Sequence, residues 1–317
     1  MDTAFDIMGL GTVFVDDIIH VPAYPQADTK VAVTREDRVP GGCIANALAA
    51  AAALGARCML LARLGESDLS RYICRALQQA GVDTSRVIAD ASAGPGHSVI
   101  LADDRRGSRA ICYNMAPCRP LAGSDLPEER LKNTQVLLVD HFEAVAALAV
   151  APLARRLGIP IVLEHEWPDA PQRAELVAAA DHVIVSMEFA RAITKESQPS
   201  QAVQALHNGR AGTVVTCGDQ GCYFLAARAR DAQFQPAFKG KTVETTGCGD
   251  VFHGAYAAAL AQGQDVAGCV QVASAAAAVY AFRPSGWQYL ARRGEVERMM
   301  GGGTAVELEK QNTESRD

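Results

Sequence analysis

The sequence predicts an α/β fold: a mostly parallel central sheet with helices on both faces. Two observations support this prediction. Short apolar runs bounded by turn or charged residues alternate with longer helical stretches along the chain. Gly55, Gly81 and Gly158 each stand just past a helical stretch, where helices often end in a left-handed residue. Such alternation is typical of a parallel sheet that helices cover on both sides.

The expected elements follow in chain order. We expect strands at residues 7–17, 58–62, 136–139, 159–163, 182–185 and 213–216. We expect helices at residues 44–54, 69–79, 144–157, 199–208, 251–260 and 270–280. Two segments break the alternation. Residues 17–40 are long, extended and polar, and residues 96–114 have the pattern of a β-hairpin.

Composition excludes several classes of protein. The 317 residues carry a net charge of −6 without a block of Lys and Arg, which argues against nucleic-acid binding. No apolar run reaches the roughly 18 residues that a membrane span needs, and no signal peptide is visible. The nine cysteines are scattered without a Cys-x-x-Cys pair, which argues against a disulfide framework or a zinc site. These features predict a cytoplasmic protein without a membrane or nucleic-acid partner.

The most informative segment is residues 244–250, with the sequence ETTGCGD. It has the pattern of the end of a strand, a glycine turn and the start of a helix at Val251. The turn brings backbone N–H groups close to a ligand, and the helix N-terminus adds free donors and a partial positive charge. Together they predict an anion site, most simply for a phosphate. Asp250 stands where a phosphoryl-transfer enzyme needs a base, although Asp at this position also caps helices.

Four motifs, in this order, resemble those of the ribokinase-like (PfkB) carbohydrate kinases. Asp16 in the opening strand stands at the sugar-binding position of that family, and residues 41–46, GGCIAN, resemble its Gly-Gly signature. Thr216, Gly218 and Gly221 form a similar nucleotide-side turn, and residues 245–255, TTGCGDVFHGA, resemble the C-terminal signature. The resemblance covers about residues 5–290. Residues 235–238 and 283–284 resemble most closely the sulfofructose kinase and ketohexokinase-like branch.

The resemblance implies one ribokinase-like kinase domain over residues 1–300. It further implies a small β lid, built from about residues 17–40 and 96–114, over the sugar site. Residues 301–317 are glycine-led and then polar, so we expect a flexible tail. The implied activity is ATP-dependent phosphorylation of a sugar hydroxyl, with Mg²⁺ accompanying ATP.

The resemblance also assigns roles to residues. Asp250 is the expected general base, and the N–H groups of Gly247, Cys248 and Gly249 are expected to hold the phosphoryl oxygens. The residues expected to bind the sugar are Asp16, Gly41, Gly42 and Asn46, with Lys30 of the lid segment in reach. The residues expected on the nucleotide side are Thr216, Gly218, Gly221 and Gly286, with helix 270–280 beside them.

Two positions depart from the family pattern. The family's Asn-x-x-Glu motif, which helps to organise Mg²⁺, is replaced by Ser186 and Phe189, so Glu188 is the remaining metal candidate. Glu244 stands where the family usually has Asp, a position that helps related kinases to bind a monovalent cation. A longer carboxylate either preserves or abolishes that K⁺ site.

The substrate stays open at this stage. A small ketose or furanose-like sugar is the favoured class, because His141 and Phe142 stand where a sulfonate-specific enzyme is expected to have arginine. The alternatives are a nucleoside kinase of the same family and a non-catalytic sugar-binding regulator, which would not need to keep Asp250. A nicotinamide-dependent oxidoreductase is disfavoured because Gly9-x-Gly11 lacks the third glycine. The oligomeric state stays open, with a homodimer as one alternative.

Overall fold

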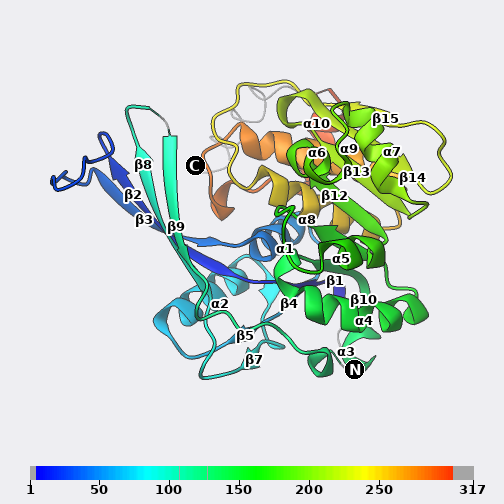
Figure 1. Cartoon of the computed structure of the whole chain (residues 1–317), viewed down its shortest axis with the longest axis horizontal. Helices are drawn as coiled ribbons and strands as arrows, with labels where there is room; N and C mark the ends of the chain where they lie inside the picture. The colour runs from blue at the N-terminus through cyan, green and yellow to red at the C-terminus, as the bar shows by residue number, and fades with distance from the viewer. Residues whose placement is uncertain (1–4, 107, 127, 303–317) are drawn as a thin grey trace.

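A nine-stranded sheet forms the centre of the molecule (Figure 1). The computed structural model describes residues 5–106, 108–126 and 128–302. Across the sheet lie β15 (Gln233–Pro236), β14 (Gly221–Ala226), β13 (Gly212–Thr216), β12 (His182–Ser186), β11 (Ile161–Glu164), β10 (Thr134–Val139), β1 (Phe5–Leu10), β4 (Cys58–Leu61) and β6 (Val82–Asp83). The strands from β13 to β6 are parallel, and the hairpin of β14 and β15 extends the sheet in the antiparallel sense. The predicted mostly parallel sheet is confirmed.

Helices cover both faces of this sheet, as predicted (Figure 1). One layer contains α1 (Cys43–Ala53), α8 (Cys248–Ala261) and α9 (Val266–Ala281), and the other contains α4 (Ala144–Leu157), α5 (Arg173–Ala179), α6 (Met187–Thr194) and α7 (Pro199–His207). The remaining helices are α2 (Asp68–Gln79), α3 (Glu128–Leu131) and α10 (Arg293–Met300), with short 3₁₀ turns η1 (Gly123–Asp125), η2 (His141–Glu143), η3 (Gly218–Gln220) and η4 (Trp287–Tyr289).

Successive side chains of each strand point to opposite faces of the sheet, so the buried side chains form two hydrophobic cores, one on each face. In β1, Ile7 packs toward α1, α8 and α9, whereas its neighbour Met8 packs toward the opposite helix layer. Leu138 and Leu137 of β10 divide in the same way. Because both faces are buried in the middle of the sheet, the inner positions of these strands, residues 7–10 and 136–139, are apolar or glycine, and this explains the continuous apolar runs in the sequence.

A separate four-stranded sheet projects from one side of the molecule (Figure 1). Its order is β3 (Arg35–Gly41), β2 (Phe14–Val21), β8 (Gly96–Asp103) and β9 (Ser108–Asn114). The strands β8 and β9 form the predicted hairpin. A further small pair joins β5 (Arg63–Leu64) to β7 (Ile88–Ala89).

The prediction of one continuous strand over residues 7–17 was wrong. The chain leaves the main sheet after Leu10 and enters the small sheet at Phe14, so Asp16 belongs to the small sheet. The break lies at Gly11, where a Cβ atom would stand 1.9 Å from Cγ1 of Ile44. Since residues on both sides of the break are apolar, the hydrophobic pattern gave no sign of it.

Other sequence expectations can also be compared with the structure. In the described residues, no helix combines the length and the apolar content that crossing a membrane requires. All nine cysteines lie in the described part of the chain, and each is free. Residues 303–317, most of the expected tail, lie outside the described residues.

The helices α1 and α8 approach each other closely enough to exclude a side chain. A Cβ atom on Gly254 of α8 would lie 2.0 Å from the backbone oxygen of Ala47 in α1. Most other positions along this contact are alanine, which lets the two backbones come near. The contact therefore fixes the spacing between the two helices whose N-terminal turns carry Asn46 and Asp250.

We expect Gly254→Ala to lower the free energy of unfolding by about 1–3 kcal/mol, because the added methyl group must displace backbone atoms of α1. Urea denaturation followed by circular dichroism measures the change. Gly294→Ala in α10 is the matched control, since its Cβ would meet only the flexible end of Arg298 at 3.4 Å. Equal stability of the two variants would contradict the proposed close contact.

Candidate active site

Asp250 lies in the first turn of α8, because this helix begins at Cys248 rather than at the expected Val251. The residue before the helix, Gly247, has φ 81°, a left-handed conformation that favours glycine. The first N–H groups of a helix have no acceptor within it. The N–H group of Cys248 donates to the carbonyl of Thr245 at 3.2 Å. The N–H groups of Gly249 and Asp250 stay available to an anion.

Asn46 holds the Asp250 carboxylate in place. Its Nδ2 donates a hydrogen bond of 2.7 Å to Oδ2 of Asp250, and its Oδ1 accepts one of 2.8 Å from Nε1 of Trp287. Because the Trp287 indole can only donate, it fixes which end of the amide faces Asp250. Asn46 was expected among the sugar-binding residues. In the structure it orients the candidate base, and its contact with a sugar stays a prediction.

Burial gives Asp250, the candidate base, a pKa near neutral pH. The side chain is 9% exposed, and this burial is the main reason that its pKa rises to about 7. The hydrogen bond from Asn46 lowers the pKa, whereas the negative charges of Glu166 and Asp16 raise it further. A base is most effective when its pKa lies near the working pH.

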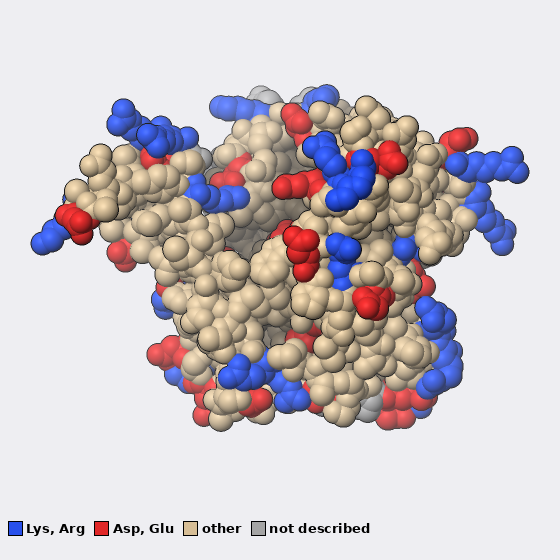
Figure 2. Space-filling view, viewed as in Figure 1, with Lys and Arg blue, Asp and Glu red and all other residues tan. Residues whose placement is uncertain are grey.

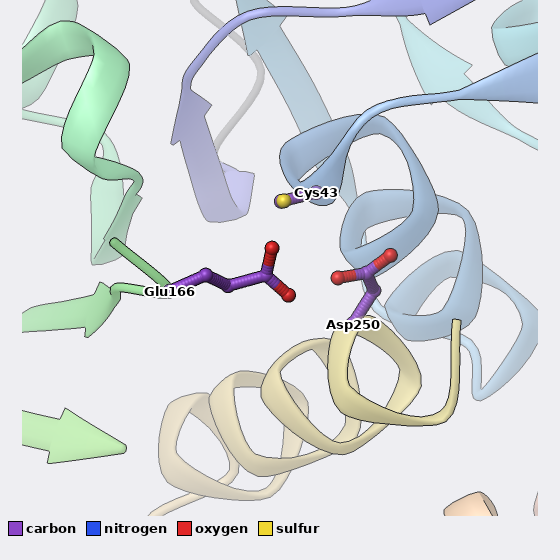
Figure 3. A group of neighbouring side chains, drawn as sticks. All are labelled: Cys43, Glu166 and Asp250. Carbon is purple, nitrogen blue, oxygen red and sulfur yellow. The ribbon is translucent and has the colours of Figure 1, made fainter. Parts of the chain in front are cut away.

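Two carboxylates that the motifs did not indicate stand close to Asp250. Glu164 ends β11 and is 2% exposed, and Glu166 follows it in the connection to α5. One donor atom from each of Cys43, Glu166 and Asp250 lies within 4.8 Å of the other two, and Figure 3 shows the two carboxylates pointing toward each other. In the sequence, two acidic residues at the end of a buried strand could have indicated these carboxylates, because ligand sites gather at the carboxyl ends of parallel strands.

Asp16 faces the same region from the small sheet. In this sheet Val39, Asp16, Ser98 and Tyr113 lie abreast, so their side chains share one face. A Cβ atom on Gly41 would lie 2.1 Å from Oδ2 of Asp16, so the glycine leaves room for the carboxylate. Burial raises the pKa of Asp16, and a hydrogen bond from Ser98 opposes the rise.

Gly42 lies beside this group at the start of α1. Its φ of 96° favours glycine, and a Cβ there would lie 2.8 Å from the carbonyl oxygen of Thr12. The structure thus brings Asp16, Gly41 and Gly42 together. Lys30, by contrast, lies in the exposed connection between β2 and β3, at the opposite end of these strands from Gly41. Its contact with substrate stays a prediction.

The shared face of the small sheet contacts the body of the protein at several points. Arg109 of β9 donates to Oγ1 of Thr246 and lies 3.7 Å from Oε1 of Glu244. Aromatic rings meet between Tyr113 and Trp167, with centroids 6.1 Å apart, and between Phe14 and Phe142, at 6.3 Å. Figure 2 shows the surface hollowed where the small sheet meets the body. The small sheet therefore forms a wall of the hollow.

A cavity of about 470 Å³ lies on the other side of the α8 N-terminus. Three residues predicted on the nucleotide side, Thr216, Gly218 and Gly221, line it together with α9, and their contact with a nucleotide stays a prediction. Lys239, which sequence reasoning missed, also lines it. Gly286 is not among the described residues of this lining, and its N–H bonds to the Tyr280 hydroxyl at 2.9 Å.

A second cavity of about 360 Å³ adjoins the first, because Thr216 and Gly249 line both. Its walls include the carboxylates of Glu164, Glu166 and the exposed Glu188. A molecule that fills the larger cavity and extends past Gly249 therefore reaches the acidic cavity beside Asp250. This arrangement suits a long anionic ligand that a divalent cation accompanies.

Glu244 holds the turn that precedes α8. Its Oε1 accepts hydrogen bonds from the N–H groups of Thr245 (2.8 Å) and Thr246 (2.9 Å) and from the Thr246 hydroxyl (2.8 Å). Burial raises the pKa of Glu244, but these hydrogen bonds and the charge of Arg109 outweigh it, so the pKa lies below its ordinary value. The carboxylate is thus ionised at neutral pH.

Comparison with known proteins agrees with this geometry. Residues 8–286 match the family described as pfkB family carbohydrate kinase. A ribokinase from Bacillus subtilis is 26% identical to this chain over 93% of this chain and 99% of the ribokinase. A fructokinase from Oryza sativa is 28% identical over 78% of this chain and 81% of the fructokinase. The solved structure of Arabidopsis thaliana ribokinase with ribose and ATP has a TM-score of 0.82 at 21% identity, covering 94% of this chain and 99% of its own.

An anion-binding helix terminus between a nucleotide-sized cavity and a carboxylate-rich hollow defines a phosphotransferase. The chain belongs to the pfkB family of carbohydrate kinases, which are ATP-dependent phosphotransferases.

We expect Asp250→Asn to lower turnover by about 10²-fold or more, because the amide keeps the shape of the side chain but cannot accept the proton. The Michaelis constant for the acceptor should change little. For the unsubstituted enzyme, kcat/KM should rise with pH and level off above about 7, since the base acts only when it is deprotonated. Steady-state assays of ADP release across pH 5–9, a range chosen to span that pKa, measure both effects. Near-normal turnover of the variant would exclude Asp250 as the base.

Proposed function

We propose that this enzyme transfers the terminal phosphoryl group of ATP to a hydroxyl of a small, uncharged ketose or furanose-like sugar. The single observation that carries the proposal is the position of Asp250. It is buried, oriented by Asn46, and placed at a helix N-terminus that both cavities share. ATP would fill the larger cavity, and the sugar would lie between Asp250 and the small sheet.

In the proposed reaction, the Asp250 carboxylate takes the proton of the acceptor hydroxyl as its oxygen bonds to the terminal phosphorus. The bond from that phosphorus to the bridging oxygen breaks, and ADP leaves. The N–H groups of Gly247, Gly249 and Asp250 would hold the phosphoryl oxygens while their charge is redistributed. The N–H of Cys248, which the sequence placed in this role, is instead bonded to the Thr245 carbonyl. The thiol of Cys248 takes no part, because burial raises its pKa to about 12. General-base assistance of this kind is typically worth about 10²–10⁴ in rate.

The acidic cavity fits a divalent cation at the triphosphate. Mg²⁺ prefers oxygen ligands and keeps several waters. Glu188 offers an exposed carboxylate in the lining of this cavity. Glu188 would then help to organise Mg²⁺ in place of the family's Asn-x-x-Glu motif, which this chain lacks. Mg²⁺ would neutralise phosphate charge during transfer.

The surroundings of Asp16 support an uncharged acceptor. Its cross-strand neighbours on the shared face of the small sheet, Val39, Ser98 and Tyr113, are not cationic. Arg109 of the same face is engaged by Thr246 and Glu244. Across the hollow, Phe142 and Trp167 present aromatic rings. A sulfonate or phosphate placed among these carboxylates and rings would lose its hydration without a compensating charge. We therefore favour a neutral sugar over the sulfofructose that the branch resemblance suggests.

The aromatic rings also favour a second candidate. A nucleoside could stack its base against Trp167 and Tyr113 while Asp16 binds the ribose hydroxyls. The non-catalytic regulator is disfavoured, because the chain keeps Asp250, its Asn46 partner and the glycine turn.

We propose that the small sheet closes on the bound sugar as a lid. The contacts of Arg109 and Tyr113 with the body are few and partly exposed, so they can break and re-form. Closure would exclude water, which otherwise competes with the sugar for the phosphoryl group.

An ADP-release assay with ATP and a panel of ketoses, pentoses, sulfonated sugars and nucleosides tests the proposed function. We expect a neutral ketose or furanose to give the highest kcat/KM. Asp16→Ala should raise the Michaelis constant of that acceptor by about tenfold and leave that of ATP unchanged, since a buried hydroxyl partner is lost. Preference for a nucleoside would favour the second candidate, and no turnover with any acceptor would overturn the proposal.

We further propose that K⁺ binds beside Glu244 and holds the turn of residues 245–247 in its phosphate-binding shape. Glu244 is ionised, and Oε2 is the oxygen that its hydrogen bonds to the turn leave free. Potassium should raise kcat several-fold relative to the same ionic strength of tetramethylammonium. Equal rates would mean that the hydrogen bonds of Glu244 and the charge of Arg109 hold the turn without a cation.

A further inference from the structure

Glu166 is the nearest carboxylate neighbour of the proposed base that the function has not yet used. Its side chain reaches from the connection after β11 toward Asp250 on α8, with Cys43 at the start of α1 as the third member of the group (Figure 3). The donor atoms lie within 4.8 Å of one another. Two carboxylates at this separation repel each other when both are charged.

The donor set does not suit a metal ion. Burial raises the pKa of Cys43 well above its ordinary value, so its sulfur is a neutral thiol and a poor ligand. Mg²⁺, moreover, prefers oxygen to sulfur. The proximity of this thiol lowers the pKa of Asp250 slightly.

The charged and polar groups around Asp250 come from every element packed against its turn. They are Asn46 and Cys43 from α1, Asp16 from β2, Glu164 at the end of β11, Glu166 after it, and Tyr280 from α9. Among the described residues, no Lys or Arg is found in this set. The Coulombic effects on Asp250 come from Glu166 and Asp16, and both favour its protonated form.

Glu166 differs from the other acidic neighbours in its surroundings. Glu164 is 2% exposed, and burial, its largest effect, raises the pKa of that side chain well above the ordinary value. Asp16 is partly engaged by Ser98 and is proposed to bind the sugar. Glu166 is an exposed residue, so solvent reaches it more readily than the buried Glu164, although desolvation of its carboxyl group raises its pKa. It is therefore the neighbour best able to act on Asp250 by charge.

We propose that Glu166 is a positioning residue for phosphoryl transfer, whose carboxylate makes Asp250 a stronger base toward the acceptor hydroxyl. This inference rests on the proposed function of Asp250. A carboxylate with the ordinary affinity for protons accepts the proton of an alcohol poorly, and a nearby negative charge increases that affinity. Lid closure over the sugar would remove water from the pair and strengthen the effect.

Glu166→Gln tests the inference, because it removes the charge and keeps the length of the side chain. The rising limb of kcat/KM against pH should move toward acid by about one unit, the lower end of what a neighbouring like charge produces. Turnover on the high-pH plateau should fall about threefold or more, since the remaining base is weaker. The Michaelis constant for ATP should stay within about twofold.

Two further variants sharpen the test. Glu166→Asp keeps the charge but moves it away from Asp250. The rising limb of its kcat/KM profile should therefore lie between those of the unsubstituted enzyme and Glu166→Gln. Asp169→Asn is the matched control, because Asp169 is an exposed carboxylate in the same connection and is not among the groups that act on Asp250. Its profile should match that of the unsubstituted enzyme. A Glu166→Gln limb that stays in place or moves toward alkali would overturn the inference.

A measurement without turnover separates this inference from the proposed function. Carbon-13 NMR of the Asp250 carboxyl group gives its titration midpoint directly in the full-length protein. The midpoint should fall in Glu166→Gln and stay unchanged in Asp169→Asn, whether or not a substrate has been found. An unchanged midpoint in Glu166→Gln would overturn the inference even if the kinase activity is confirmed.

Discussion

The contact between α1 and α8 determines the geometry of the whole site. At Gly254 the backbones of the two helices meet with no room for a side chain. This spacing lets the short amide of Asn46 reach Asp250, and it places the N-terminal turns of both helices side by side. A wider separation would break that hydrogen bond and leave a buried carboxylate without its partner, which is costly in a water-poor environment.

Burial of acidic groups is the second organising feature. Asp250, Glu164 and Asp140 are all buried, and each has a pKa raised mainly by desolvation. Asp140 accepts hydrogen bonds from the N–H groups of Thr12, Phe142 and Glu143, so it ties the break after β1 to the end of β10. Such a site stays stable because the carboxyl groups can be neutral or hydrogen-bonded, and the same property gives it a base near neutral pH.

The small sheet contributes the other half of the site. It carries Asp16 toward Asp250 and supplies Arg109 to the turn before α8. One set of strands therefore links the acceptor side with the anion-binding turn. Asp16 on β2 and Arg109 on β9 belong to the same four-stranded sheet, so a movement of this sheet would shift both side chains together.

The sequence by itself determined the layered α/β fold, the hairpin of residues 96–114, and the positions of Asp250 and the glycine turn. These features depend on local periodicity and on short motifs that act through neighbouring backbone groups. The tertiary structure alone decided the break after Leu10, the partnership of Asn46 with Asp250, and the approach of Glu166. The break lies between apolar residues, and Gly11 packs there against Ile44 with no room for a side chain. The other two join residues far apart in the chain, and their distances depend on how α1, α8 and β11 pack around the same point.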